Sequence, residues 1–592
     1  MSKNWDHNEK TGWKCWLAFI LAPTAIILGT IGYWISTGST PGINAWLDAL
    51  YRSLQLLLFR MTPVPSIHWT LDLARWLAAA VFGLATVLAV FRVFHNELRQ
   101  IRLQIPWPRH VVILGLGPMT LQLVQCYRGQ GRRVVVVAPT FDTKSGDVCR
   151  AKGTTLVMGE LTDPATLIKA RVYRASHVIA LSEEDSTNIA IADEVRKLIL
   201  KRECKSHSNS QPPVKCFVHL SNVDARTSLR ASAAFGGVCR CPIRFFDLFD
   251  AAARKLLLDA GQMPLDQGGI GKDDPRHVHL VILGFGRMGQ TIALRAAQLG
   301  HFANGKPLRI SVIDQQADQR KQALLFRYPN FEKTCQIEFH ALNMESLPAR
   351  QMLETWSADK TNVVSIVICF DHDELAMEVA LRMKSKLDLM QVPLFVRMSS
   401  KSGFASVLQG ATAAMPSQVH AFGMVQDCCT DHLLEDTLNE KLAETIHNSF
   451  RVEKTEAYRR KNENPDKDIS TRIWTELDEG LKDSNLQQAN HIDTKLHAIG
   501  LERVSIIDPR LPVERLGPED VELLAEMEHN RWNAERWLQG WTLGASNKPN
   551  KITPYLVPWN QLSYDIQEYD RQTVRRIPDF LHAVDQKVCK KS

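Results

Sequence analysis

The sequence has few of the features that would assign a chemistry directly. Its twelve cysteines contain no Cys-x-x-Cys pair, and neither Cys239 and Cys241 nor the adjacent Cys428 and Cys429 are followed by a matched pair of histidines. This spacing does not fit a zinc finger. It is typical of reduced cytosolic thiols, with a redox or metal role as the alternative. The net charge of +7 is small for 592 residues, so nucleic acid is not expected as a partner.

Charge is missing from a long run near the N-terminus. Residues 15–35, CWLAFILAPTAIILGTIGYWI, hold no charged side chain over 21 positions, and residues 76–94 hold only Arg92. A helix of this length crosses the ~30 Å of hydrocarbon in a bilayer. The first run is too long for a typical signal peptide and has no obvious small-residue cleavage site. The sequence therefore predicts a membrane domain at residues 1–104 with two transmembrane helices; two buried core helices are the alternative.

Basic residues flank both predicted spans. They are Lys3, Lys10 and Lys14 before the first span, and Arg92, Arg99, Arg102 and Arg109 after the second. Because basic residues stay on the cytoplasmic side of a membrane, both ends of the hairpin are predicted to be cytoplasmic. The expected location is the inner cell membrane, with the N- and C-termini in the cytoplasm.

The segment between the predicted spans carries an apolar stripe at helical spacing. Its members are Ile43, Trp46, Leu47, Leu50, Leu54, Leu57 and Leu58. This pattern favours a helix like the pore helix of a two-span channel subunit, or a helix lying on the outer membrane surface. The following residues, FRMTPVPSIHW, contain no TVGYG-type glycine loop, so a K⁺ selectivity filter is not expected.

A glycine fingerprint occurs twice, as HVVILGLGPMT at residues 110–120 and HVHLVILGFGRMGQ at residues 277–290. In each copy, a run of strand residues ends at Gly-x-Gly and passes into a helical pattern. Such glycines allow a tight turn and bring backbone N–H groups close to a phosphate at a helix N-terminus. The glycines are Gly115 and Gly117 in the first copy, and Gly284, Gly286 and Gly289 in the second.

Strand and helix patterns alternate after each fingerprint. They predict two Rossmann-like α/β domains with parallel sheets, at residues 105–262 and 275–435. The stretch GELTDPATL…ASHVIALSEEDSTNIAIA in the first copy resembles the regulator-of-K⁺-conductance (RCK) family, also called TrkA-N. The resemblance implies a nucleotide ligand: NAD(H), an adenine nucleotide or a cyclic nucleotide. It also implies a homo-oligomer that opens or closes a membrane pore, with a tetramer favoured because four chains supply the eight domains of a gating ring.

The two copies differ in their expected binding residues. The second copy completes Gly-x-Gly-x-x-Gly, with Arg287 and Met288 inside the loop and Arg287 placed to meet a phosphate. Asp314 ends its second strand and is predicted to hold a ribose hydroxyl. In the first copy, Thr120 replaces the third glycine and no acid ends the second strand. A different anion bound by Arg132 and Arg133, or a purely structural half, is expected there.

Strand patterns are absent after about residue 436. LAETIHN at 442 matches LAEMEHN at 524, and WTEL at 474 matches WNQL at 559, which predicts two copies of a helical hairpin. EHNRWNAER and GWTLG resemble the ryanodine-receptor (RyR) repeat domain. The resemblance implies an all-α domain at residues 436–582.

Four residues of the second hairpin are candidates for a ligand site. Glu528, Asn530, Arg531 and Trp532 place charge, amide and indole within two turns of one helix. Arg531 and Trp532 could stack on a base while Glu528 reads its edge. The alternative is a core helix ringed by charge, because adjacent helical residues point in different directions.

These features favour a ligand-gated membrane protein, an ion channel or a channel-like effector without a K⁺ filter. A non-conducting membrane-anchored sensor or scaffold is the alternative. A membrane-anchored NAD(P)-dependent oxidoreductase is less favoured, because no compact set of catalytic side chains accompanies either fold. The chain is therefore not expected to be an enzyme, and no metal site is predicted.

Overall fold

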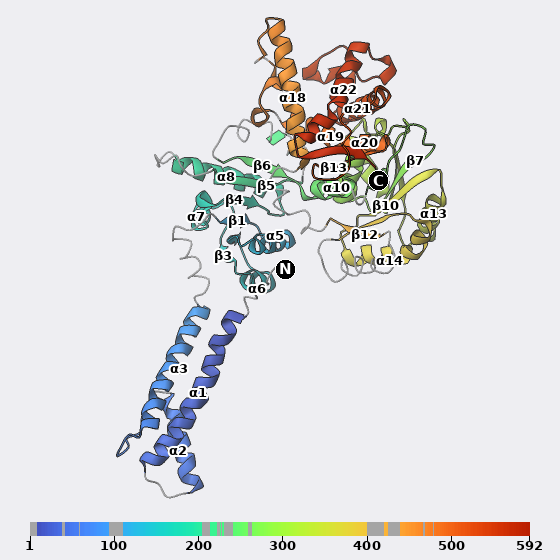
Figure 1. Cartoon of the computed structure of the whole chain (residues 1–592). Coiled ribbons are helices and arrows are strands. Elements are labelled where there is room, and N and C mark those ends of the chain that lie inside the picture. The colour runs from blue at the N-terminus through green and yellow to red at the C-terminus, as the bar shows by residue number, and fades with distance from the viewer. Residues whose placement is uncertain are drawn as a thin grey trace. The chain divides into compact units, whose positions relative to one another are not determined.

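The computed structural model describes residues 9–37, 42–57, 60–93, 110–203, 213–221, 225, 228–229, 241–258, 263–398, 419–423, 438–465, 468–477 and 479–591. The chain divides into two compact units, Met1–Pro108 and Arg109–Ser592. Figure 1 shows the first unit in blue and the second from teal to red.

The N-terminal unit is a hairpin of two long helices with a short helix between them. Its helices are α1 (Glu9–Ser36), α2 (Ile43–Leu56) and α3 (Trp69–Val93). Gly32 lets α1 and α3 approach closely, because a Cβ at this position would lie 2.6 Å from the backbone nitrogen of Leu71. The Ser53 hydroxyl of α2 donates to the carbonyl of Ile26 at 2.7 Å, which ties α2 to α1.

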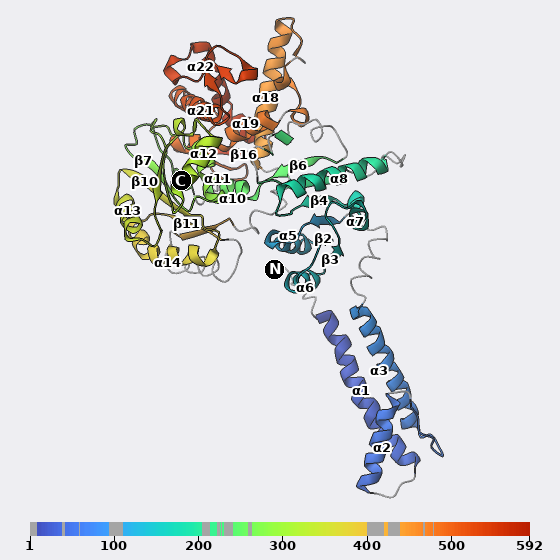
Figure 2. The ribbon, with the colours of Figure 1, turned by 180° about the vertical axis from the view of Figure 1, so that it is seen from behind.

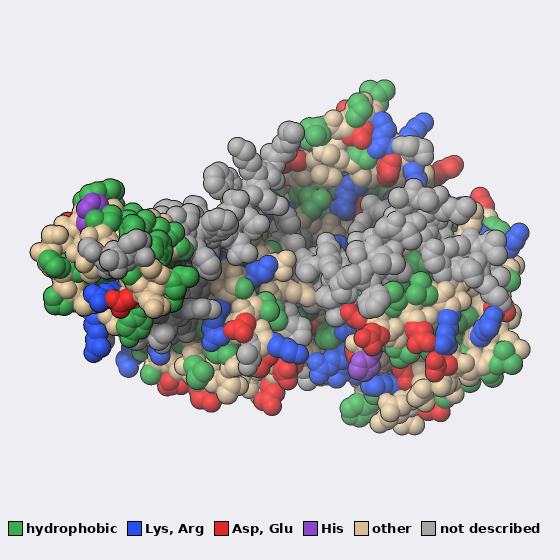
Figure 3. Space-filling view, turned by 90° about the horizontal axis from the view of Figure 1, so that it is seen from below, with side chains coloured by type: hydrophobic (Ala, Val, Ile, Leu, Met, Phe, Trp, Pro, Cys, Tyr) green, Lys and Arg blue, Asp and Glu red, His purple; other side chains and the backbone are tan. Residues whose placement is uncertain are grey.

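The predicted amphipathic helix between the long helices is confirmed as α2. It buries a face of small and aliphatic side chains, Ala49, Ser53 and Leu56. Its apolar stripe faces outward, with Ile43, Trp46, Leu47 and Leu54 exposed. Figure 3 shows hydrophobic side chains gathered over the surface of this unit.

No helix in the described part of the chain combines the length and apolar character that crossing a bilayer requires. The predicted spans at residues 15–35 and 76–94 are therefore not confirmed. Of the basic residues behind the predicted orientation, Lys3, Arg99, Arg102 and Arg109 lie outside the described residues.

The first α/β domain is built on a parallel sheet in the order β3-β2-β1-β4-β5-β6. Its strands are β1 (Val111–Leu114), β2 (Val134–Ala138), β3 (Thr155–Met158), β4 (His177–Ala180), β5 (Lys215–His219) and β6 (Ile243–Phe246). Its helices include α5 (Pro118–Gly129), α6 (Thr143–Ala151), α7 (Pro164–Lys169), α8 (Asp185–Glu203) and α10 (Leu248–Leu258). The β1 and β2 side chains are fully buried, as expected for strands covered on both faces.

The second α/β domain repeats this order as β9-β8-β7-β10-β11-β12, again parallel throughout. Its strands are β7 (His277–Leu283), β8 (Arg309–Asp314), β9 (Gln336–Ala341), β10 (Asn362–Ile368), β11 (Leu394–Arg397) and β12 (Val419–Phe422). Its helices include α11 (Arg287–Leu299), α12 (Ala317–Arg327), α13 (Leu347–Ala358) and α14 (Asp373–Met390). The prediction of two Rossmann-like domains with parallel sheets is confirmed.

The two α/β domains share a hydrophobic core. One cluster of buried side chains runs from β1 and β2 through α10 to β7 and α11. A buried ion pair at 2.5 Å joins Arg295 of α11 to Asp250 of α10. The last helix of the first domain is therefore packed against the first helix of the second.

The C-terminal region contains the predicted repeat. Its helices include α18 (Leu438–Arg460), α19 (Glu479–Asn490), α20 (Ile492–Ala498), α21 (Pro518–Leu538), α22 (Tyr564–Arg575) and α23 (Ile577–His582). Equivalent histidines make equivalent contacts: His447 Nε2 lies 2.8 Å from the Arg472 carbonyl, and His529 Nε2 lies 2.7 Å from the Val557 carbonyl. Figure 2 shows this helical region from behind.

Short strands accompany these helices, although the sequence patterns predicted none. β13 (Leu501–Ser505) pairs antiparallel with β16 (Gln586–Lys590), and β14 (Thr542–Leu543) pairs with β15 (Ile552–Thr553). β13 and β16 end equivalent halves of the repeat, so their pairing joins the two halves with twofold symmetry. The region is mainly helical, as predicted, but it is not all-α.

The helical region is joined to the second α/β domain by buried polar contacts. His497 Nδ1 lies 2.9 Å from Asp266 Oδ2 in the segment that precedes β7, and His491 Nε2 lies 3.2 Å from the carbonyl of His301. The buried core of the helical region also includes Ala303 of the second domain.

We expect His301 to make stability depend on pH. Burial lowers its pKa from 6.5 to about 4, so the folded protein holds the ring neutral. The folded protein keeps its full stability above pH 6.5 and loses stability as the pH falls toward 4, because the unfolded chain takes up the proton first. The loss of unfolding free energy is about 2 kcal/mol at pH 5. Melting of wild type and His301→Gln at pH 7.5 and 5.0 tests this, because glutamine keeps a donor for the Ala297 carbonyl. The variant should lose less stability on acidification; equal losses would contradict the assignment.

Candidate nucleotide-binding sites

Both glycine loops lie at the carboxyl edge of a sheet, where the strand order reverses. The first follows β1 beside β4, and the second follows β7 beside β10. Gly115 has φ +121° and Gly284 has φ +87°, a region that favours glycine. A Cβ on Gly115 would lie 2.5 Å from the Leu181 carbonyl oxygen, and one on Gly284 would lie 2.8 Å from the Phe370 ring. This is the position at which open α/β sheets bind ligands.

The second loop leaves the N-terminus of α11 open. Gly289 packs the helix against the loop, because a Cβ there would lie 2.4 Å from the Gly284 carbonyl oxygen. Gly286 is the N-cap residue of α11, with no side-chain cap among the described residues, and Met288 in the first turn is buried. The first N–H groups of α11 can therefore donate hydrogen bonds to a bound anion.

Asp314 lies at the end of β8, as predicted, and faces the glycine loop. Its Oδ2 accepts the N–H of Phe285 at 2.7 Å, and its Oδ1 accepts the N–H of Gln316 at 2.7 Å. The loop that lengthens its spacing from Gly289 is closed by a β-bridge between His301 and Pro307. Asp314 is partly exposed, so its remaining lone pairs can accept ribose hydroxyls.

Arg287 reaches out of the second loop to the first domain. Its Nη1 donates to the Ser221 hydroxyl at 3.1 Å, just beyond β5. The Ser221 N–H and hydroxyl both donate to Asp185 Oδ1, at 3.0 and 3.3 Å, where α8 begins. Sequence reasoning placed Arg287 on a phosphate and could not find this contact, because Ser221 lies 66 residues earlier in the chain.

Asp371 and Arg397 form an ion pair at the same edge of the second sheet. Arg397, at the end of β11, donates from Nη1 to the Asp371 carboxylate and, at 3.3 Å, to the Phe370 carbonyl. Its guanidinium carbon lies 5.5 Å from the ring centroid of Phe249, on α10 of the first domain. The DHDE loop was noted in the sequence, but neither residue was predicted to belong to the site.

The first domain has a pocket of about 450 Å³ at the ends of β2, β3 and β4, within the size range of small-molecule sites. It is lined by Pro139, Glu160, Leu161, Thr162, Ser182, Ser186, Thr187 and Ala190. The lining contains hydroxyl groups and one carboxylate. That this copy lacks standard NAD binding stays a prediction; Pro139, and not an acid, directly follows the last residue of β2.

Two further details distinguish the first copy. Thr120, in place of the third glycine, is buried and donates its hydroxyl to the Gly115 carbonyl at 3.0 Å. Arg132 and Arg133 do not reach the pocket, which corrects the expectation that they bind an anion there. They precede β2 and therefore lie at its amino end, where Arg132 Nη1 is 3.3 Å from His177 Nδ1.

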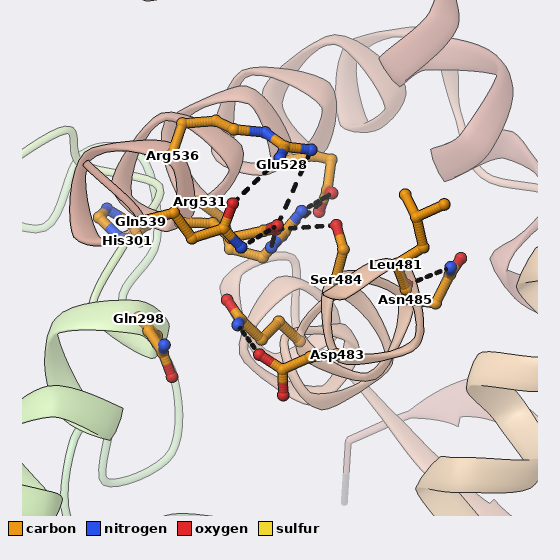
Figure 4. A network of polar contacts seen from close by, with 12 residues as sticks. Gln298, His301, Leu481, Asp483, Ser484, Asn485, Glu528, Arg531, Arg536 and Gln539 are labelled. Atoms are coloured by element: carbon orange, nitrogen blue, oxygen red, sulfur yellow. Dashed lines mark hydrogen bonds and ion pairs between the residues drawn. The ribbon is translucent and has the colours of Figure 1, made fainter. Parts of the chain in front are cut away.

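In the helical region, Glu528 and Arg531 face the interior (Figure 4). Glu528 accepts from Lys495 at 2.5 Å and from Arg531 at 2.8 Å, and Arg531 also contacts Glu535 at 2.8 Å. These side chains are at most 4% exposed. Burial raises the pKa of Glu528, but Arg531 and Lys495 outweigh it and bring the pKa to about 2. The geometry is that of a charged core helix, the alternative left open by the sequence.

Trp532 and Asn530 point elsewhere and are half-buried. The Trp532 ring stacks on His529, with centroids 6.0 Å apart. The guanidinium carbon of Arg536 lies 5.3 Å from the Trp532 centroid and 5.0 Å from that of Trp541. Arg536, one helical turn further on, therefore stacks on Trp532. Arg531 is instead buried between Glu528 and Glu535, so it does not share a face with Trp532, as stacking of both on one base requires.

Residues 111–212 match the TrkA-N domain family, and residues 517–590 match the RyR domain family. A comparison with curated proteins gives no match. Solved structures similar to this chain include GsuK bound to ADP (17% identity, TM-score 0.36, 73% of this chain and 99% of that chain). The GsuK channel bound to NAD is also similar (15% identity, TM-score 0.36, 72% and 82%). The apo structure of D-lactate dehydrogenase from Escherichia coli is 11% identical, with a TM-score of 0.19, and the match covers 55% of this chain and 95% of that chain. The TrkA-N and RyR resemblances are confirmed over the matched residues.

Glu528 offers a test of the internal ionic network. Glu528→Gln leaves Lys495 and Arg531 short of a buried counter-charge, so we expect stability to fall by about 3 kcal/mol. Glu526→Gln, an exposed neighbour on the same helix, should change it by less than about 0.5 kcal/mol. Thermal unfolding of both variants makes the comparison. Equal, small effects would show that the network does not hold this region together.

Proposed function

We propose that this protein is a nucleotide-responsive membrane protein that conducts ions without K⁺ selectivity. In this proposal, the N-terminal unit lies in the inner cell membrane, and the α/β and helical domains face the cytoplasm as ligand sensors. The observation that carries the proposal is the pair of glycine loops, each at the reversal point of its sheet and joined through one shared core. Ligand occupancy shifts the population of the two packed domains, and the chain between residues 95 and 108 transmits the change.

The ligand assignment rests most on the second domain. The uncapped N-terminus of α11 can bind a phosphate, and Asp314 at the end of β8 can accept hydrogen bonds from ribose hydroxyls. Together they fit a nucleotide such as NAD(H), an adenine nucleotide or a cyclic nucleotide. The TrkA-N match of the first domain supports the same class of ligand. The pocket of that domain has the size for a second ligand. Binding without turnover is proposed for both domains.

The membrane assignment rests on the surface of the N-terminal unit. Large apolar side chains are exposed on all three of its helices; they include Ile27, Ile35, Trp46, Leu47, Leu54, Trp69, Trp76 and Phe82. Water disfavours this many exposed apolar side chains, whereas lipid or a neighbouring chain would cover them. A homo-oligomer, with a tetramer favoured, would let α2 of several chains surround a common axis.

A non-conducting membrane-anchored sensor or scaffold is the second candidate. The observation in its favour is the outward-facing stripe of α2, whose exposed members are Ile43, Trp46, Leu47 and Leu54. This stripe suits a helix resting on the membrane surface as well as one packed near a pore.

Flux through liposomes that contain the full-length protein separates these candidates. We expect a nucleotide-dependent flux of both K⁺ and Na⁺, and Leu54→Asp should change or abolish it by charging the α2 stripe. Asn44→Asp adds the same charge at an exposed polar position of α2 and should leave flux nearly unchanged. Flux no greater than that of protein-free liposomes, with nucleotide binding intact, would favour the scaffold.

Asp314 tests the nucleotide site itself. Asp314→Ala removes the acceptor for a ribose hydroxyl, so we expect ADP or NAD affinity at the second domain to fall by about 1–3 kcal/mol. Asp318→Ala removes an exposed acid from the first turn of α12 and serves as the control. Calorimetric titration of the full-length protein measures both. Unchanged affinity in Asp314→Ala would remove the ribose assignment.

A further inference from the structure

We propose that the Asp371 carboxylate occupies the phosphate position of the second nucleotide site in the absence of ligand. Only a ligand that carries a phosphate then displaces this carboxylate from Arg397. This inference rests on the nucleotide site proposed above. It adds the ligand chemistry that the site selects and the residue that sets the selection.

The position of Asp371 relative to the glycine loop is the first observation. Its Oδ2 lies 3.9 Å from where a Cβ on Gly286 would be, and no other described atom outside the local chain lies within 4 Å of that point. Gly286 is the N-cap of α11, on the side from which a phosphate reaches the first helical N–H groups. A carboxylate therefore stands beside the open face of the loop.

Arg397 is the second observation. Its side chain is 15% exposed, and contacts with the Phe370 carbonyl and the Phe249 ring hold it in place. Asp371 is 77% exposed, so it can turn into solvent without breaking a packed core. Within this pair the arginine is fixed and the carboxylate is free to leave.

The chemistry of the pair follows from charge. In the empty site, Asp371 neutralises Arg397 and lies near the positive end of α11. A phosphate offers the guanidinium more acceptor oxygens than a carboxylate does, and it is repelled by Asp371 if the carboxylate stays. Binding therefore exchanges one anion for another on Arg397. A nucleoside brings no anion and cannot make this exchange.

The exchange gives Asp371→Asn an unusual predicted sign. Removing the competing charge frees Arg397, so ADP should bind about tenfold more tightly, whereas adenosine should be unaffected. Arg397→Gln should weaken ADP about tenfold. Glu374→Gln removes an exposed acid from the first turn of α14, three residues after Asp371, and should change ADP affinity less than twofold. This variant controls for a general loss of negative charge.

Isothermal titration of the full-length protein with ADP and with adenosine tests the proposal. Because both α/β domains are proposed to bind a nucleotide, the titration has to distinguish the two sites. The binding event that Asp314→Ala weakens is assigned to the second site. Tighter ADP binding in Asp371→Asn with unchanged adenosine binding supports the inference. Weaker or unchanged ADP binding in that variant, or no ADP binding in any variant, overturns it. If Asp371→Asn tightens ADP but flux ignores nucleotide, the proposed channel function fails and the anion exchange stands.

Discussion

The arrangement of the large unit depends on one buried cation. Arg295, in the middle of α11, pairs with Asp250 of α10 at 2.5 Å and donates to Gln298 at 2.8 Å. The carboxylate of Asp483, on α19, also stabilises the positive charge of Arg295. A buried guanidinium without counter-charges costs several kcal/mol, so the three elements that carry these groups are held at fixed positions around it. The N-terminus of this same helix is the open end of the second glycine loop.

This placement makes α11 the shared element of the α/β and helical domains. A ligand bound at its N-terminus acts on a helix whose buried side contacts the first domain through α10 and the helical region through α19 and α21. Arg287, the first residue of the helix, adds a second link through Ser221 to Asp185, beside the pocket of the first domain. The helical region is thus packed onto the second domain, and its buried ionic network lies close to the end of α11. In the proposed function, occupancy of either site would reach all three domains through these packed side chains.

Local patterns in the sequence were enough to predict much of this structure. The glycine spacing, the alternation of strands and helices and the acid at Asp314 are set by residues close in sequence, and the structure placed them as expected. The offset of 85 residues between Trp474 and Trp559 likewise located the two equivalent halves of the helical repeat. Arg132 was predicted to lie at the carboxyl edge of the first sheet, which is wrong. Its position just before β2 in the sequence already places it at the amino end of that strand.

Contacts between distant residues could not be predicted in this way. Helical spacing showed that Glu528 and Arg531 lie near each other, but not that their side of α21 faces the core and Lys495. The Asp371–Arg397 pair depends on two neighbouring strands, β10 and β11, and on the register that brings their ends together. β13 and β16 were missed because LERVS and QKVCK are short and alternate weakly, and each is stabilised by a partner 85 residues away.

The central claim is that one assembly combines nucleotide sensing with a membrane-embedded oligomer. Native mass spectrometry of the detergent-purified full-length protein tests it most directly, because it reports subunit number and retained ligand mass together. The account predicts a tetramer that carries nucleotide. A monomer or dimer without retained nucleotide would contradict it.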